Sequence, residues 1–390
     1  MRKIAPARLL LPLALVFVLS QFAPAQTRDV SKFVTAQTRD TRAALASFPD
    51  SQAVLFVNAR RIVNEVLPRL MPPAEYQKLV GGAEKGGFDL RALDYAAVGI
   101  RFPEPAPVGG VPEFVVVVRG GFNADTLLAL GRVGISSMGV KPRQESYGSK
   151  TIEIIDTSEV AKMAGVGEAA STTPYTQMGL PSKIPYPEIG VVALDSETLV
   201  FGVPAYVKSA IDAAGGRGGL KSSTLDLAAR DPQALWSLTA DIPPSLSDTI
   251  HKFGAPPNEE LDRMLSWIKQ VSVSQGMNAV DYTLSASVLT DAPEHASAFS
   301  GLIRMGLLAV QTGLGEEAAK QNGKDAANAR RALEVLKTVV NRTEGNTLVV
   351  SASVSQAAVA EMIKEQTAKP AVTKPRTTRR TTRRRARRRH

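Results

Sequence analysis

Cysteine is absent from this chain of 390 residues, and histidine occurs only three times. The lack of cysteine excludes disulfide bonds, thiolate metal sites, a cysteine nucleophile and lipid attachment through an N-terminal cysteine. The three histidines, His251, His295 and His390, are far apart and have no partners at metal-ligand spacing. We therefore expect neither a zinc site nor a histidine-based triad, and we predict no metal and no other cofactor.

Long apolar runs are also missing. The longest, residues 9–19, is interrupted by Pro12 and falls well short of the roughly 20 residues that span a bilayer. Basic residues precede this run, and the small residues Ala23 and Ala25 follow it at the positions that a signal peptidase reads. The sequence therefore predicts a signal peptide over residues 1–25 and a protein exported to the periplasm or beyond.

Motifs for catalysis are equally scarce. Residues 165–170 and 313–318 match a loose dinucleotide fingerprint, but neither follows a predicted strand, as that fingerprint requires. The neighbours Glu259 and Glu260 point apart on a helix, which favours a solvated face. Arg101 and Arg119 on predicted strands would bind an anion only if they faced one another, and ordinary surface charge is the simpler interpretation. These absences predict a protein that is not an enzyme.

Acidic residues are lacking in one region only. The segment from Lys369 to His390 holds nine arginines and two lysines without any acid, and the signal segment holds three more basic residues. Removing these fourteen from the total of 47 leaves 33 basic residues against 37 acidic ones, so the body is mildly acidic. With almost nothing apolar, residues 367–390 are expected to form a disordered tail.

The clearest structural unit lies over residues 188–214. Two β-favouring runs, 191–194 and 198–201, flank Asp195-Ser196-Glu197 in a spacing that predicts a hairpin. Pro204 then opens a helix with apolar residues on one face, and Gly215 and Gly216 close it. Further strands are predicted over residues 54–57, 93–102, 114–119, 151–155, 271–274 and 282–288, and further helices over 62–70, 124–133, 291–308 and 325–340. Asn123 is predicted to cap the helix over 124–133, and Asp291 and Glu294 form a capping-box pattern ahead of the helix through Leu308.

Parts of the first half return in the second half in the same order. Residues 50–59 align without gaps on residues 231–240, residues 130–134 match 302–306, and Thr198-Leu199-Val200 matches Thr347-Leu348-Val349. Three matches in one order favour an internal duplication over chance. We predict an α+β fold of two related repeats, each a mostly antiparallel sheet with helices packed on one face. The predicted segments are a polar spacer over 26–47, repeat 1 over 48–214, a Gly/Ser linker over 215–230 and repeat 2 over 231–366.

The region from Phe48 to Pro244 resembles a group of exported bacterial proteins of unknown function. The features that carry this resemblance are the opening strand after Pro49-Asp50, with Ala53 three residues later, and the Thr198-Leu199-Val200 hairpin before a short helix. The resemblance implies no known activity, so no functional residue is carried over from it.

Two functional hypotheses follow. The first is a non-enzymatic binding or structural protein of the cell envelope, held by its tail to anionic envelope polymers or lipid head groups, because the arginine fork binds phosphate or carboxylate oxygens bidentately. The predicted export argues against nucleic acid as the tail's partner. The tail residues predicted to bind are Lys374, Arg376, Arg379, Arg380, Arg383, Arg384, Arg385, Arg387, Arg388 and Arg389.

The alternative is a periplasmic carrier of an apolar ligand held between the two repeats. This hypothesis depends on the helix through Leu308, which is apolar on more than one stripe and is therefore predicted to be buried, and on the loop over residues 159–187. The loop residues predicted to contact the ligand are Tyr175, Met178 and Tyr186. An enzyme of unknown class ranks third, and no catalytic residue is predicted.

Overall fold

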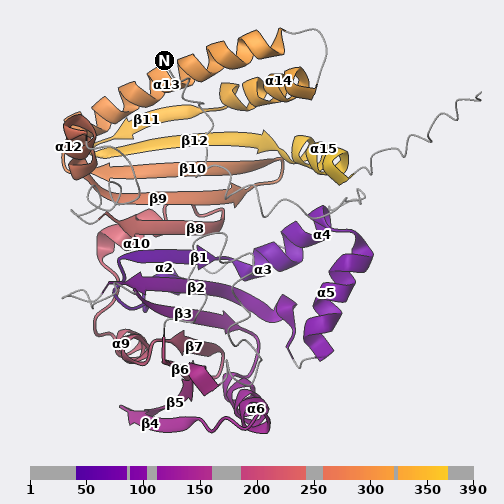
Figure 1. The fold of residues 1–390 in the computed structure, drawn as a ribbon, viewed down its shortest axis with the longest axis vertical. Helices are drawn as coiled ribbons and strands as arrows, with labels where there is room; N and C mark the ends of the chain where they lie inside the picture. Colours follow the sequence, from indigo (N-terminus) through magenta and orange to yellow (C-terminus); the bar gives the residue numbers. More distant parts are fainter. Residues whose placement is uncertain are drawn as a thin grey trace, which may run out of the picture.

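One twelve-stranded sheet organises the molecule (Figure 1). The structure, a computed structural model, describes residues 41–85, 88–102, 112–159, 186–242, 258–319 and 324–367. Every neighbouring pair of strands is antiparallel, which confirms the predicted α+β class. The strands are β1 (Ala53–Val57), β2 (Leu93–Arg101), β3 (Glu113–Gly120), β4 (Arg143–Tyr147), β5 (Lys150–Asp156), β6 (Glu188–Asp195), β7 (Thr198–Gly202), β8 (Ala234–Asp241), β9 (Ile268–Met277), β10 (Asp281–Thr290), β11 (Val340–Glu344) and β12 (Thr347–Ser355).

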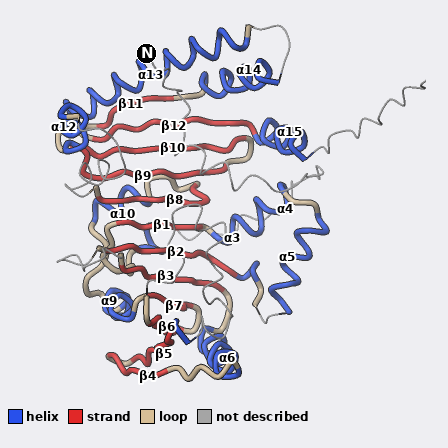
Figure 2. The backbone as a smooth tube through the Cα atoms, in the orientation of Figure 1, coloured by secondary structure: helices blue, strands red, loops and turns tan. Residues whose placement is uncertain are grey.

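The helices lie around this sheet, as the tube in Figure 2 shows. Several of them are short turns of three to five residues. The helical elements are α2 (Thr41–Leu45), α3 (Ala59–Arg61), the π-helical turn Ile62–Val66, α4 (Leu67–Leu70), α5 (Pro73–Lys85), the 3-10 turn Leu90–Ala92, α6 (Ala124–Ser137), α9 (Pro204–Ala214), α10 (Ser222–Ala228), α12 (Glu259–Trp267), α13 (Pro293–Ala318), α14 (Lys324–Lys337) and α15 (Gln356–Thr367).

The order of the strands is mirrored about the central pair β1–β8. On one side it runs β1-β2-β3-β7-β6, and on the other β8-β9-β10-β12-β11, with β5 and β4 added beyond β6. A duplication of the kind predicted would produce this order, but strand order alone leaves the duplication a prediction. What the topology does show is that the two halves share one sheet, because β1 pairs with β8 over five residues.

The predicted hairpin and its helix are confirmed. The backbone N–H of Glu197 donates to the carboxylate of Asp195 at 2.8 Å, which closes the turn between β6 and β7. Pro204 occupies the first turn of α9, where its missing N–H costs nothing. Asn123 likewise caps α6 as predicted, since its side chain accepts from the backbone N–H of Thr126 at 2.8 Å.

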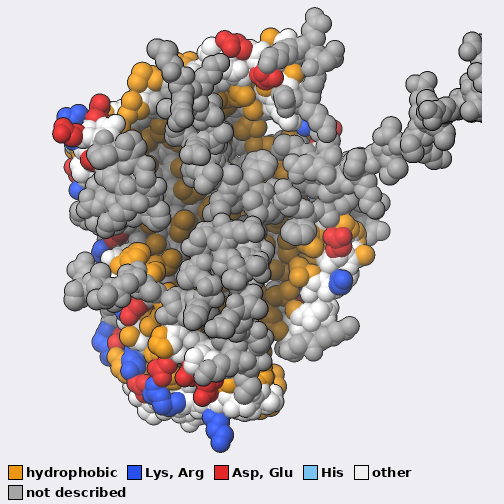
Figure 3. Space-filling model, viewed as in Figure 1, with side chains coloured by type: hydrophobic (Ala, Val, Ile, Leu, Met, Phe, Trp, Pro, Cys, Tyr) orange, Lys and Arg blue, Asp and Glu red, His pale blue; other side chains and the backbone are white. Residues whose placement is uncertain are grey.

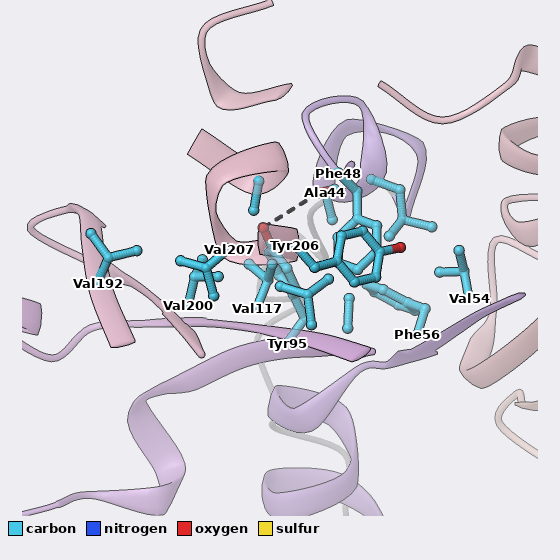
Figure 4. Close-up of a cluster of buried hydrophobic side chains, with 14 of the residues drawn as sticks. Ala44, Phe48, Val54, Phe56, Tyr95, Val117, Val192, Val200, Tyr206 and Val207 are labelled. Atoms are coloured by element: carbon cyan, nitrogen blue, oxygen red, sulfur yellow. Dashed lines mark hydrogen bonds between the residues drawn. The ribbon is translucent and has the colours of Figure 1, made fainter. Parts of the chain in front are cut away.

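One face of the first half carries the main hydrophobic core (Figure 4). Alternate residues of the strands, such as Val54, Phe56 and Val115, are buried there under α2 and α9. Tyr206 of α9 is fully buried, and its hydroxyl donates to the backbone carbonyl of Asp50 at 2.9 Å. Helix α9 is therefore fixed to the start of β1 both by apolar burial and by a buried hydrogen bond.

Two segments predicted to lie outside the repeats contain helices that pack on the sheet. Helix α2 falls within the predicted spacer over 26–47, yet its Leu45 is completely buried in the core. Helix α10 falls within the predicted linker over 215–230, and it buries Thr224 and Leu227. The sequences around these two helices are mostly polar, so the few apolar residues that pack on the sheet do not stand out in the sequence.

The prediction that the helix through Leu308 is buried was wrong. Of the residues in α13 only Ala296 and Ser300 are buried, while Met305 is 61% and Leu308 58% exposed. The helix lies at one end of the sheet beside β10, β11, β12 and α14, so its other sides have no sheet to cover them. The predicted capping box is also absent, because the Asp291 carboxylate pairs with His295 instead.

The two outermost strands, β4 and β11, were missed in the sequence, and residue Val340 belongs to β11 instead of the preceding helix. Their sequences RQESY and VNRTE contain little that is apolar, and most of their residues are exposed or half-exposed. Polar residues suit an edge strand, because they discourage pairing with another chain. Within the described residues, no helix combines the length and apolar character that a membrane span requires.

Candidate functional site

The second face of the sheet differs from the core face. Because side chains alternate between faces along a strand, the residues between the buried ones point to the opposite side. In β1 the residue between Val54 and Phe56 is Leu55, and in β3 the residue between Val115 and Val117 is Val116. Both are half-exposed, so the first half has a closed apolar face and an open one.

The open face carries an unbroken apolar row that crosses nine strands, here named the transverse row. Each member lies directly opposite the next in the strand register, and every member is half-exposed or exposed. Leu238 is 42% exposed and Phe201 37% exposed. In order from β12 to β6, the row consists of Val350, Ala286, Val273, Leu238, Leu55, Val98, Val116, Phe201 and Val191.

Residues beside the transverse row extend the apolar surface. Ile100 and Ala53, two residues from Val98 and Leu55 along their strands, pair with one another on the same face. On the other side, Val57 pairs with Trp236. Figure 3 shows hydrophobic side chains in the hollowed middle of the molecule, between the α13 end and the α6 end.

Helices occupy both ends of this open face. Ser300 of α13 and Asn341 of β11 bond to each other twice, at 3.0 and 2.8 Å, and Asn341 lies opposite Val350. At the other end, Arg132 of α6 pairs with Glu153 of β5, which lies opposite Val191. Helices are thus present on both faces of the sheet, whereas the sequence predicted them on one.

A smaller hydrophobic cluster limits the open face along one side. Its buried members come from the π-helical turn, β8, β9 and β10, and they are Val66, Leu235, Met277 and Tyr282. The partly buried residues packed against them are Ile62, Leu70, Trp236 and Val359. Figure 1 shows α3, α4 and α5 along this side of the sheet. The transverse row is therefore bordered by helices at its two ends and along one flank.

The predicted ligand residues divide between described and undescribed segments. Tyr175 and Met178 lie outside the described residues, as do all the predicted tail residues from Lys374 to Arg389. Tyr186 is described, and its ring contacts Phe114 edge-on with 4.9 Å between centroids. Burial raises the pKa of the Tyr186 hydroxyl. Phe114 is on the same face of β3 as Val116, so Tyr186 lies at the margin of the open face.

The strand arginines do not form an anion site together. Arg101 lies opposite Glu113 and donates to its carboxylate at 2.6 Å. Arg119 donates to Glu197 at 3.0 Å, at the far end of the same strand pair. Each guanidinium is therefore paired with its own carboxylate, in agreement with the surface-charge interpretation.

Ionisable side chains gather at few points of the described chain. No group of three or more His, Asp or Glu residues able to hold a metal is found in the described ranges. His295 stacks on Trp267 with 3.9 Å between ring centroids, and its Nδ1 lies 2.6 Å from Asp291. This contact lowers the pKa of the Asp291 carboxyl, since the imidazole bonds its charged form. The arrangement joins the end of α12 to the first turn of α13.

Sequence reasoning missed the transverse row, although one signal for it was present. Strands β1 and β3 contain the consecutive apolar runs AVLFV and FVVVV, which place apolar residues on both faces of a strand. Such runs predict either coverage of both faces or a face that binds something apolar. Only the register between strands shows that the second set of residues forms one continuous row.

The comparisons with known proteins leave the function open. No family model and no curated protein sequence matches this chain. Among solved structures, crystal form III of a protein named TP0453 has a TM-score of 0.37 and 9% identity, covering 82% of this chain and 97% of that one. Crystal form IV of TP0453 has the same TM-score and 10% identity, covering 82% and 95%. These values do not contradict the resemblance to exported proteins, and they carry no argument about this chain.

Proposed function

We propose that this protein is an exported, non-enzymatic binding protein that holds an apolar chain, such as the acyl chain of an amphiphile, along the transverse row. The observation that carries the proposal is a row of nine apolar residues on nine adjacent strands, none of them buried. A contiguous apolar surface that folding leaves uncovered typically marks an interaction site. The row also crosses the β1–β8 pair, which agrees with a ligand held between the two halves.

The length of the row suits an extended hydrocarbon chain. Neighbouring strands are about 4.8 Å apart, so eight spacings extend over about 38 Å. One leaflet of a bilayer's hydrocarbon core is about 15 Å deep, which corresponds to about three strand spacings. A single acyl chain lying across the strands would therefore cover about four strands, and the row is long enough for two chains end to end.

The energetics favour a chain over a small apolar molecule. Each buried methylene contributes about 0.8 kcal/mol, so a twelve-carbon chain with half of its surface covered gains about 4 to 5 kcal/mol. Association costs at least a similar amount. Measurable binding therefore needs contacts beyond the flat sheet, and the flanking α6 and α13 carry exposed apolar side chains, including Leu130, Val133 and Leu302.

The test is direct binding of dodecanol to the mature chain, residues 26–390, followed by tryptophan fluorescence. Trp236 borders the row, and Trp267→Phe leaves it as the single tryptophan. Leu238→Asn replaces a row residue by a polar one of similar volume. Its matched control is Leu79→Asn on α5, because Leu79 is also 42% exposed but is not part of the row.

We expect Leu238→Asn to weaken dodecanol binding about tenfold, since an amide without a partner against a hydrocarbon chain costs about 1 to 3 kcal/mol. Leu79→Asn should bind as the parent does. Equal affinities of the two variants, or no binding to the mature chain, would overturn the proposal. The mature chain lacks the apolar residues 9–19, so this segment cannot lie on the transverse row and compete with dodecanol in this experiment.

A second part of the proposal concerns the tail and is favoured by its composition. Near an anionic membrane surface each Lys or Arg contributes about 1 kcal/mol, and the attraction decreases with salt. We propose that the tail holds the protein at an anionic surface of the envelope while the sheet binds its ligand. Sedimentation with vesicles containing anionic lipid is expected to fall when residues 369–390 are deleted or when salt is raised. Unchanged, salt-independent sedimentation would refute the tether without affecting the sheet proposal.

A further inference from the structure

The β5 end of the transverse row terminates in a buried carboxylate. Glu153 lies directly opposite Val191, the last apolar member, and opposite Gln144 of β4 on its other side. Its side chain is only 4% exposed. The row therefore passes from nine apolar residues to an acidic group without a change of face.

The hydrogen bonds of Glu153 are distributed unequally. Its Oε1 accepts from Arg132 and, at 2.8 Å, from Nε2 of Gln144. Among the described residues, its buried Oε2 has no hydrogen-bond partner. A buried charged oxygen without a donor is costly, so this atom favours a ligand that brings one.

The opposite end of the row is polar but satisfied. Asn341 donates from Nδ2 to the backbone carbonyl of Ser300, and its Oδ1 accepts from the Ser300 hydroxyl. This reciprocal pair uses both functional groups of the amide and fastens α13 to β11. The two ends thus differ: among the residues that the structure describes, the Glu153 end has a buried oxygen without a partner, whereas both polar atoms of the Asn341 amide are bonded.

From this asymmetry we propose that the ligand is an amphiphile with a hydrogen-bond-donating, preferentially cationic head group, an alkyl amine in the simplest case, bound at Glu153 Oε2. This inference rests on the proposed function, since its chain lies on Val191, Phe201 and the next members of the row. An amine supplies both the missing donor and a charge opposite to that of the carboxylate. A carboxylate head group supplies neither.

Access to Glu153 depends on Arg132 and α6. The Arg132 side chain is 45% exposed, so water can solvate its guanidinium once it leaves. Glu153 is only 4% exposed, so Arg132 leaves it only when another cation takes its place. Helix α6 itself is weakly held, because Ala124 is its only buried residue. The head group binds Oε2 and replaces the guanidinium as the counter-charge of the carboxylate, while Gln144 keeps its bond to Oε1.

The experiment compares three probes with the same twelve-carbon chain, namely dodecylamine, dodecanol and dodecanoate, bound to the mature chain below their micelle concentrations. We expect the amine to bind at least tenfold more tightly than the carboxylate, with the alcohol between them. Glu153→Gln removes the negative charge and replaces one carboxylate oxygen by an amide NH₂ donor, so it should abolish or reverse this preference. Glu145→Gln on the adjacent strand is the control, because Glu145 pairs with Lys208 and lies opposite Ile152, on the core face.

A second variant keeps the inference testable if Glu153→Gln is unstable. Arg132→Gln removes the competing cation from a half-exposed position, so it should raise the affinity for dodecylamine several-fold. Equal binding of all three probes, with Leu238→Asn still weakening each, would refute the head-group inference and leave the proposed function standing. Absence of binding by every probe would refute both, and a preference for the amine that survives Glu153→Gln would place the head group elsewhere and overturn the inference.

Discussion

The side chain of Arg61 connects the two halves of the sheet, and its loss is expected to destabilise the whole fold. Arg61 ends α3, directly after β1, and is only 6% exposed. Its Nη1 donates to the backbone carbonyl of Gln233 at 2.6 Å and its Nη2 to that of Met277 at 2.7 Å. These carbonyls lie at the start of β8 and the end of β9, so one guanidinium from the first half binds two strands of the second.

The magnitude follows from these two charge-assisted bonds. Each hydrogen bond to a charged group contributes about 1.5 to 3 kcal/mol, so Arg61→Ala should lower the free energy of unfolding by about 3 to 5 kcal/mol. In Arg61→Ala the carbonyl of Gln233 still accepts a long hydrogen bond, 3.3 Å, from the backbone N–H of Met277. We therefore expect a loss of stability below the sum of two full hydrogen bonds. The i,i+4 contact with Glu65, at 3.3 Å, adds little because Glu65 is 41% exposed.

Urea unfolding followed by both circular dichroism and Trp236 fluorescence measures this change. Because β1 and β8 belong to one sheet, we expect the two signals to change in a single transition in the parent protein. The control is Arg42→Ala, whose ion pair with Asp226 is more than half exposed on both sides and should contribute no more than about 1 kcal/mol. A loss for Arg61→Ala as small as that of the control would refute the reasoning.

Three further outcomes are expected. Burial raises the pKa of Tyr206 to about 12. The buried, neutral hydroxyl of Tyr206 therefore stabilises the fold fully below about pH 10. Its contribution to the free energy of unfolding decreases by up to about 1.4 kcal/mol per pH unit as the pH rises through 12. Urea titrations at several pH values should show this decrease in the parent protein and a weaker one in Tyr206→Phe. Gly99→Ala should cost about 1 to 3 kcal/mol, because its Cβ would lie 2.7 Å from the Ser51 hydroxyl and 2.8 Å from the Phe48 ring. Gly81→Ala, in an open position on α5, should instead raise the midpoint of the same titration slightly, since alanine favours a helix by up to about 1 kcal/mol. A stabilised Gly99→Ala variant would contradict the packing described around Tyr206.

Features encoded by a few consecutive residues were predictable. The turn at Asp195 and Glu197, the proline start of α9 and the Asn123 cap depend on contacts within four residues, and each is present. Burial depends on more distant neighbours, which explains the error at α13. Its apolar residues suggested a core helix, but the end of the sheet offers it a partner on only part of its surface.

The candidate site depends on distant neighbours to a still greater degree. Leu55 and Leu238 are neighbours because β1 pairs with β8, although more than 180 positions separate them in the chain. Each row member, taken singly, is an ordinary apolar strand residue, and a shift by one residue in any strand would turn its member to the other face. Glu153 likewise becomes a candidate binding residue only because it lies opposite Val191 and pairs with Arg132.

By itself, the sequence determined the α+β class, most strands and local caps, the absence of cysteine chemistry, and the basic composition of the last residues, because these properties reside in composition or in short segments. Only the tertiary structure decided that both halves share one sheet, that one face of the sheet is closed while the other exposes an apolar row, and that this row ends at a buried carboxylate. These depend on strand register and on which helix covers which face, and both result from contacts between residues far apart in the chain.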